Sequence, residues 1–290
     1  MKHVTILSIA AALALGALCG PAMAQGAPNA EALGWRIGCQ AYSFNHFTFF
    51  EAVDKVASLG LKWIEAYPGQ KLSKDTGDAV FDHNMSPEMQ KVALDKLKSA
   101  NVKLVNYGVV GLPGNEAEAR KVFDFAKAMG METIVSEPDY ETLPMLSKLA
   151  DEYGINIAIH NHPKPSKYWN VDTVVEKTKG LSKRVGSCAD TGHWIRSGLS
   201  SLEAIKKLNG RIISLHLKDL NELSPKAHDV PWGTGKTDIK AILEELNRQG
   251  FKGVFSAEYE WNWDNSVPEL AQCVANIDKM AAEIAAKNKK

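Results

Sequence analysis

The sequence predicts an α/β protein that folds as a single (β/α)8 barrel, and three observations support this prediction. Eight short runs rich in β-forming residues alternate with amphipathic helical segments beyond residue 34. Such alternation is typical of parallel strands joined by right-handed crossovers, and eight units in about 250 residues match a closed barrel. No G-x-G-x-x-G turn follows the first strand, which disfavours the open doubly wound sheet. The barrel is predicted over residues 35–290, after a lead-in over 25–34.

The predicted strands are short runs of β-branched and apolar residues. They cover residues 36–43, 62–67, 103–110, 133–136, 156–160, 184–189, 211–217 and 253–258. The segments between them carry apolar residues at helical spacing. In one segment these residues are Ala119, Val122, Phe123, Ala126 and Met129. Two connections, 68–86 and 219–237, are unusually long, and in a barrel they would lie at the C-terminal face beside an active site.

The first 24 residues are predicted to be a secretory signal peptide. Lys2 and His3 precede an apolar run, which is followed by the small-x-small cleavage site Ala22-Met23-Ala24. The run has about 16 residues, fewer than the ~20 needed to cross hydrocarbon. We therefore expect an exported protein, periplasmic or secreted, with no stable membrane insertion after signal cleavage.

The composition narrows the range of partners. Lys and Arg number 34, Asp and Glu number 34, and the formal net charge is zero. No nucleic-acid partner is expected, because such a partner needs a basic excess on one face. Cys39, Cys188 and Cys273 remain after signal removal, and in a domain of this size they are predicted to be free buried thiols. A homo-oligomer remains open.

Polar residues stand at or just beyond the C-terminal ends of seven predicted strands. They are Glu65, Asn106, Glu137, His160, His162, Asp190, His193, His216, Lys218, Glu258 and Glu260. Each alone fits a helix cap or a solvated rim, but a closed barrel brings all of them around one mouth. So many acids in one concave site are costly unless a cation neutralises them. Carboxylate and imidazole ligands suit a divalent ion such as Mn²⁺, Mg²⁺, Co²⁺ or Zn²⁺.

Four segments resemble the later strands of the xylose isomerase-like TIM barrels. They are CADTGHW (188–194), SLHLKD (214–219), PWGTGKTD (231–238) and AEYEW (257–261). That group includes sugar phosphate isomerases/epimerases, ketose 3-epimerases, inosose dehydratases and endonuclease IV. Its members hold a metal with Glu, Asp, His and Glu from successive strands. Carried over by position, the resemblance implies one divalent ion bound by Glu137, Asp190, His216 and Glu258.

The segment His160-Asn161-His162 stands where ketose 3-epimerases carry their first glutamate. It resembles the inosose dehydratase and sugar isomerase branch, in which the first ligand comes from strand four. Glu137 fills that role here, and His162 is either an extra ligand or a substrate contact.

The resemblance implies a divalent-metal-dependent sugar isomerase/epimerase that removes a proton next to a carbonyl through a metal-stabilised enediolate. The expected catalytic residues are Glu137, Glu258, His193 and Lys218. The expected substrate-binding residues are Glu65, Asn106, His160, His162 and Trp232. Two alternatives stay open: a periplasmic 3-keto-glycoside lyase or hydratase that uses the same site, and a non-catalytic sugar-binding barrel. The partner in each case is a small-molecule sugar or glycoside.

Two further features near the last strands bear on this site. Trp232, Trp261 and Trp263 either form an apolar platform on which a sugar stacks or pack helices against the barrel. The segment GTGKT (233–237) is not a P-loop, because Val230 stands where a P-loop requires glycine. We expect it to close over the substrate with its backbone N–H groups near the sugar oxygens.

Overall fold

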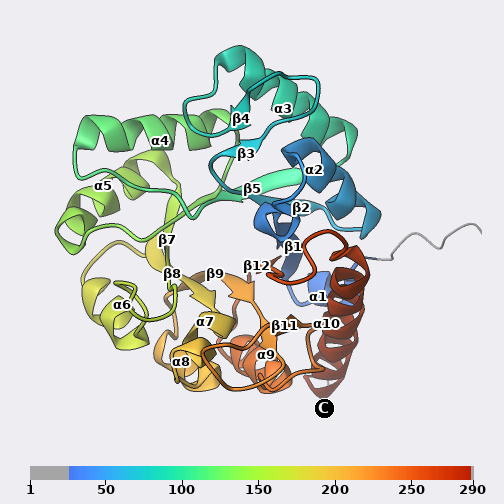
Figure 1. Ribbon diagram of the computed structural model, residues 1–290. Coiled ribbons are helices and arrows are strands. Elements are labelled where there is room, and N and C mark those ends of the chain that lie inside the picture. The colour runs from blue at the N-terminus through green and yellow to red at the C-terminus, as the bar shows by residue number, and fades with distance from the viewer. Residues whose placement is uncertain (1–25, 289–290) are drawn as a thin grey trace, which may run out of the picture.

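The computed structural model describes residues 26–288 and contains a closed barrel of eight parallel strands (Figure 1). The strands follow one another around the barrel in chain order, and the last pairs with the first. They are β1 (Arg36–Gln40), β2 (Trp63–Ala66), β5 (Lys103–Tyr107), β6 (Thr133–Ser136), β7 (Asn156–His160), β8 (Val185–Asp190), β9 (Ile212–Leu217) and β12 (Val254–Ala257). The predicted fold class and all eight predicted strands are confirmed. The predicted signal peptide lies outside the described residues.

Helices surround the barrel (Figure 1). They are α2 (Phe49–Ser58), α3 (Pro87–Ser99), α4 (Glu116–Ala128), α5 (Leu143–Tyr153), α6 (Val171–Lys177), α8 (Ser201–Lys207), α9 (Ile239–Arg248) and α10 (Val267–Lys287). Local sequence explains their starts: α2, for example, begins with a capping box in which Thr48 and Glu51 satisfy each other's backbone N–H groups. Residues 26–288 also contain two short helices, α1 (Pro28–Ala32) and α7 (Thr191–Arg196). Two 3-10 turns, η1 (Ala41–Phe44) and η2 (Tyr140–Thr142), complete the helical elements of this range.

Two strands, β1 and β5, end three residues earlier than predicted, and both ends shape the top of the barrel. β1 stops at Gln40, because the side chain of Gln40 accepts a hydrogen bond from the backbone N–H of Tyr42. This bond starts the 3-10 turn η1 (Ala41–Phe44). β5 stops at Tyr107, and Gly108 and Val109 then turn to line a cavity at the barrel mouth.

Each long connection contains a small antiparallel hairpin. β3 (Gln70–Lys71) pairs with β4 (Val80–Phe81), and β10 (Asp219–Leu220) pairs with β11 (Asp229–Val230). Both hairpins follow the carboxyl end of a barrel strand, so they lie at the C-terminal face, as predicted for connections near an active site.

The barrel interior is packed beneath this face. Val135, Ala158 and Cys188 form a small buried cluster of their own. Each stands two residues before a polar residue, and side chains two apart on a strand face the same side. Those polar residues, which therefore also face the barrel axis, are Glu137, His160 and Asp190. The close packing requires Gly186, since a Cβ atom there would lie 2.1 Å from the carbonyl oxygen of Arg211.

The three cysteines of residues 26–288 are buried and free, as predicted. Among residues 26–288, no helix has both the length and the apolarity needed to span a membrane.

Candidate active site and metal centre

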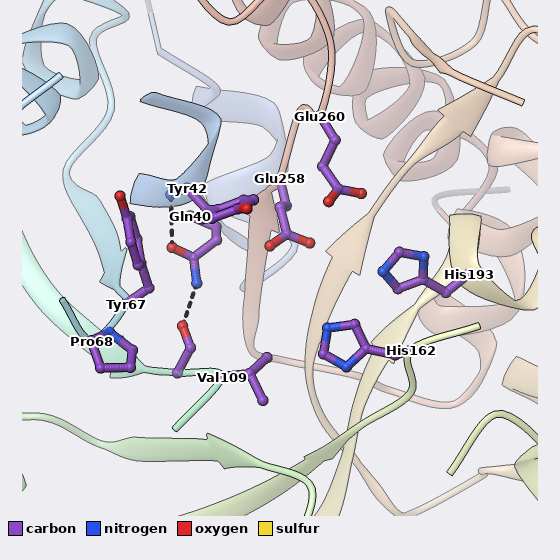
Figure 2. Close-up of a pocket in the computed structure, with 10 residues that line it drawn as sticks. Gln40, Tyr42, Tyr67, Pro68, Val109, His162, His193, Glu258 and Glu260 are labelled. Atoms are coloured by element: carbon purple, nitrogen blue, oxygen red, sulfur yellow. Dashed lines mark hydrogen bonds between the residues drawn. The ribbon is translucent and has the colours of Figure 1, made fainter. Parts of the chain in front are cut away.

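A cavity of about 360 Å³ opens at the C-terminal face of the barrel. Its lining consists of Gln40, Tyr42, Tyr67, Pro68, Gly108, Val109, His162, His193, Glu258 and Glu260. Figure 2 shows Glu258 and Glu260 on one side of the cavity, His162 and His193 on another, and Tyr67 with Pro68 opposite the histidines. The volume lies at the small end of the range for ligand pockets, which suits a single ring.

Two overlapping groups of acidic and imidazole side chains lie at this face. One contains His160, Asp190, His193 and Glu258, and the other contains Glu137, His160 and His162. Within each group the potential ligand atoms lie within 4.8 Å of one another. His160 joins the groups, because its Nδ1 lies 3.6 Å from Glu137 and its Nε2 lies 3.6 Å from Asp190. The structure therefore brings Asp190 and Glu258 together and places Glu137 in the adjoining group.

The ring of His216 is held in one orientation. Its Nε2 lies 2.9 Å from Oε1 of Glu65 and donates its proton to that carboxylate. Its Nδ1 lies 3.1 Å from Oε2 of Glu258 and 4.0 Å from Oδ2 of Asp190. A carboxylate behind a histidine in this way typically presents the other ring nitrogen to a metal. Although burial lowers the pKa of His216, the nearby Cys188, Glu65 and Glu258 raise it well above its usual value.

Glu65 and Asn106 lie behind His216 rather than at the cavity. Glu65 is fully buried, and it accepts hydrogen bonds from Gln40 (3.2 Å), Asn106 (3.1 Å) and Ser256 (2.6 Å). We therefore correct the prediction that these two residues contact substrate. They are positioning residues, because Glu65 orients His216 and Asn106 orients Glu65.

Several buried polar atoms here lack a well-directed hydrogen bond. Within residues 26–288 they include both ring nitrogens of His160, Oδ2 of Asp190 and Nδ1 of His216. Asp190 Oδ2 and His216 Nδ1 each have an ionic neighbour at 3.1 Å, Lys218 and Glu258, but burying polar atoms without well-directed hydrogen bonds is costly. Three of these atoms converge, since Asp190 Oδ2 lies within 4.0 Å of both His160 Nε2 and His216 Nδ1. Imidazole and carboxylate donors together suit a divalent transition metal. The residues present fit a bound metal ion.

Lys218 supplies positive charge to the cluster. Its buried Nζ lies 3.1 Å from Asp190, 2.8 Å from Glu258 and 2.5 Å from Glu260. Burial opposes its charge, but the three carboxylates raise the pKa of Lys218 well above its usual value. Burial likewise raises the pKa of Glu258, but Lys218 and His216 hold it well below its usual value. Lys218 therefore neutralises the acids, and direct contact with a substrate oxyanion stays a prediction.

Comparison with known proteins identifies the family of this barrel. The family model for xylose isomerase-like TIM barrels matches residues 53–280. The chain belongs to the xylose isomerase-like TIM barrel family. The resemblance predicted from its motifs is confirmed.

Three proteins that are similar to this chain illustrate the family. An inosose dehydratase of Geobacillus thermodenitrificans is 27% identical over 228 residues, which cover 70% of this chain and 69% of that protein. A solved structure of an uncharacterised Parabacteroides distasonis protein has 32% identity and a TM-score of 0.69, covering 85% of this chain and 99% of that one. A family barrel from Mycobacterium smegmatis, solved in complex with magnesium, shares the fold at 14% identity, with a TM-score of 0.69 and coverage of 86% and 97%.

The Asp-Thr-Gly-His motif of this family member builds one corner of the site. Asp190 ends β8, and its Oδ1 accepts the backbone N–H of His193 at 2.7 Å, which caps α7. Thr191 exchanges two hydrogen bonds with the backbone of Lys218, at 2.8 and 2.9 Å. Gly192 leaves room for the lysine, because a Cβ atom at this position would lie 2.9 Å from the Cβ of Lys218.

Arg196 assigns the tautomer of His193. Its Nη1 donates to Nδ1 of His193 at 3.1 Å, so the proton of the neutral ring lies on Nε2. Burial lowers the pKa of His193 well below its usual value, which keeps the ring neutral. A protonated nitrogen cannot bind a cation, so His193 acts as a hydrogen-bond donor in the cavity. Arg196 also contacts Glu260 and Asp229, each at 3.2 Å.

The His-Asn-His segment connects β7 to β8 and to the cavity. Asn161 exchanges two hydrogen bonds with the backbone of Asp190, at 3.0 and 2.9 Å. Oε1 of Glu137 lies 2.8 Å from both the backbone nitrogen and the Nδ1 of His162. Ser166 donates to the other oxygen of Glu137 at 2.9 Å. The cavity-lining imidazole of His162 is thus oriented by a carboxylate.

Trp232 and the segment 233–237 take other places than predicted. Trp232 is only 1% exposed, and its indole N–H donates to the carbonyl oxygen of Leu217 at 2.9 Å. The predicted substrate contact of Trp232 is therefore corrected in favour of packing. The carboxylate of Asp219 accepts three backbone N–H groups of segment 233–237, at 2.8, 2.8 and 2.9 Å. That loop encloses a carboxylate instead of sugar oxygens.

Proposed function

We propose that the protein is a divalent-metal-dependent enzyme that acts on a sugar or glycoside, removes a proton next to a carbonyl, and then expels a β-oxygen substituent. The observation that carries this proposal is that Glu258 and His162, whose ring Glu137 orients, line one cavity although they follow different strands. A carboxylate base and an oriented imidazole are what a proton abstraction followed by loss of an oxygen leaving group requires. The inosose dehydratase relative supports an elimination of this kind.

The proposed metal ligands are His160, Asp190, His216 and Glu258. His160 replaces Glu137 in the set predicted from the resemblance, because both oxygens of Glu137 already accept hydrogen bonds. A divalent ion at this position would supply Lewis-acid stabilisation of negative charge on substrate oxygens. The M. smegmatis relative, solved with magnesium, supports a metal here, and the identity of the ion stays open among Mn²⁺, Mg²⁺, Co²⁺ and Zn²⁺.

The protein side chains would move the protons. Glu258, kept ionised by Lys218 and His216, accepts the proton from the carbon next to the carbonyl. The carbon–oxygen bond at the β-position breaks, and His162, oriented by Glu137, gives a proton to the departing oxygen. The net change is loss of one water or alcohol. The Nε2–H group of His193 donates to a substrate hydroxyl.

The predicted isomerase/epimerase is the second candidate, because it begins with the same proton abstraction and differs in where the proton returns. The signal peptide proposed for residues 1–24 favours an unphosphorylated sugar or glycoside for either reaction, since sugar phosphates are intracellular metabolites.

Proton NMR in D₂O tests the proposal. The mature chain is loaded with Mn²⁺, Co²⁺, Zn²⁺ or Mg²⁺ and incubated with an inosose, a free ketose and a 3-keto-glucoside. We expect deuterium exchange at the carbon next to the carbonyl, together with loss of the β-substituent. Exchange that yields only an isomer or epimer would favour the second candidate. Absence of exchange with every metal and substrate would refute both.

Metal affinity is expected to increase with pH. Burial lowers the pKa of His160, but Asp190 and Glu137 outweigh it and raise the pKa above 6.5. His216, the other proposed imidazole ligand, also has a raised pKa. Each imidazole must lose a proton before it can bind a metal, so below these raised pKa values each pH unit should weaken binding by about tenfold for each imidazole. Titration calorimetry with Mn²⁺ from pH 5.5 to 8.5 measures the slope. Affinity independent of pH over this range would contradict a ligand set that contains His160 and His216.

A further inference from the structure

The loop after β12 carries two tryptophans beside the active-site mouth. Trp261 is 49% exposed and Trp263 is partly exposed, whereas Trp232 lies in the core. Together with Asn262, Asp264 and Glu269, these two tryptophans line a second, shallow cavity of about 370 Å³. Their position at the surface contrasts with the usual burial of tryptophan, so the barrel core does not explain them.

Local contacts hold this loop in one shape. Asn262 adopts a left-handed conformation with a φ of 49°, which asparagine tolerates better than most residues. Its carbonyl oxygen accepts the N–H of Asn265 at 2.9 Å, and its side chain donates to Glu269 at 2.9 Å. This tight turn separates the two indoles. Because the turn is fixed before a ligand arrives, binding costs little ordering entropy.

Tyr42 joins the second cavity to the first. It lines the active-site cavity beside Tyr67, as Figure 2 shows, and the centroids of these two rings lie 5.1 Å apart. The ring of Tyr42 also meets that of Trp263 edge-on, with centroids 5.7 Å apart. His46 fixes the junction, because its Nδ1 lies 2.9 Å from Oδ1 of Asp264. Aromatic rings thus run without a break from one cavity to the other.

The second cavity has the chemistry of a carbohydrate or aryl site. One face of Trp261 is covered by the ring of His228, stacked at 4.2 Å, while nearly half of the residue stays exposed. Flat aromatic surface suits the apolar face of a ring, and the carboxylates of Asp264 and Glu269 can accept hydrogen bonds from ring hydroxyls. Such a combination differs from a protein-docking patch, whose centre is depleted of charged residues.

We propose that this cavity is an outer subsite, which holds the second ring of a glycoside while the reacting ring occupies the active-site cavity. The inference rests on the proposed function for the identity of the reacting ring. It narrows the substrate class to glycosides, in which the oxygen that leaves carries a second sugar or an aryl group. The departing product is then an alcohol held by Trp261 and Trp263.

Equilibrium binding tests the subsite without turnover. Titration calorimetry on the mature chain compares glucose, cellobiose and phenyl β-glucoside. We expect cellobiose or phenyl β-glucoside to bind at least tenfold more tightly than glucose, and Trp261→Ala or Trp263→Ala to remove most of that advantage without changing glucose binding. Loss for cellobiose identifies a sugar as the second ring, and loss for phenyl β-glucoside alone identifies an aryl group.

The matched control is Trp169→Ala. Trp169 is also partly exposed, but it packs under the ammonium of Lys164 at 4.0 Å in the loop before α6. This variant should keep the full advantage of the two-ring ligands, and Trp263→Phe should keep most of it. Equal affinity for glucose and both two-ring ligands, or equal losses in Trp169→Ala and Trp263→Ala, would overturn the subsite. These binding results do not depend on the deuterium-exchange experiment. The subsite can therefore be refuted while the proposed function stands, and the reverse.

Discussion

Glu258→Gln is expected to lower kcat by about 10³-fold, the size of effect that removal of a general base produces. Glutamine keeps the shape of the side chain but cannot accept the proton from the substrate carbon. The carboxylate of Glu258 faces the cavity and lies 2.8 Å from Lys218 and 3.1 Å from His216, so it is ionised and fixed in place. Deuterium exchange and product formation, both measured at saturating Mn²⁺, report the loss.

Glu260→Gln is the matched control for this prediction. Glu260 lies two residues further along the chain, lines the same cavity and also contacts Lys218. Its carboxylate belongs to neither group of potential metal ligands, so the same substitution should lower kcat by about tenfold or less. Metal content by mass spectrometry separates lost metal from a lost base. Equal losses in the two variants would contradict the role given to Glu258.

The sequence alone predicted the eight strands of the barrel, because each strand is marked by a short local pattern. Each strand is a short apolar run whose inward face continues into a polar residue, as Ala158 leads to His160 and Cys188 to Asp190. Strand order then follows from parallel pairing alone. The same rule brought Asp190, His216 and Glu258 to one mouth, so these three candidate ligands could be named before their distances were known.

Parallel pairing of the strands does not predict how deeply a polar side chain at a strand end is buried. Glu65 and Asn106 stand at strand ends like the candidate ligands, but their side chains lie beneath the cavity and hold His216. Sequence position does not state whether a polar group meets solvent or another buried group. The pairing of Glu65 with His216 spans 151 residues, and no spacing signal links them.

Functional residues that lie beyond the ends of the strands were not predicted correctly, for a related reason. Arg196 faces His193 one helical turn away, a spacing that many unremarkable pairs share. Tyr42 reaches the cavity only because Gln40 ends β1 and starts a 3-10 turn. Trp232 was a fair candidate by composition, but its indole N–H found a backbone partner in the core. Side-chain partners in three dimensions decided each case.

Lys218→Met is expected to destabilise the metal-free protein by about 3–5 kcal/mol, because it leaves buried carboxylates without their partner. Asp190 and Glu258 are fully or nearly fully buried, and Lys218 contacts both. Methionine fills most of the same volume, so the loss would come from charge and not from packing. Unfolding in urea, followed by circular dichroism after treatment with a chelator, measures the change in free energy.

Adding Mn²⁺ should restore part of the lost stability in Lys218→Met, since a divalent ion would neutralise the same two carboxylates. The gain follows the occupancy of the folded state, and it should exceed that of the wild type because the variant site is more negative. Lys121→Met is the control: Lys121 pairs with Glu118 on the exposed surface of α4, so this change should cost less than about 1 kcal/mol with or without metal. Were Mn²⁺ to stabilise the Lys218 and Lys121 variants equally, the ammonium and the metal would not share Asp190 and Glu258, and the ligand set proposed above would be wrong.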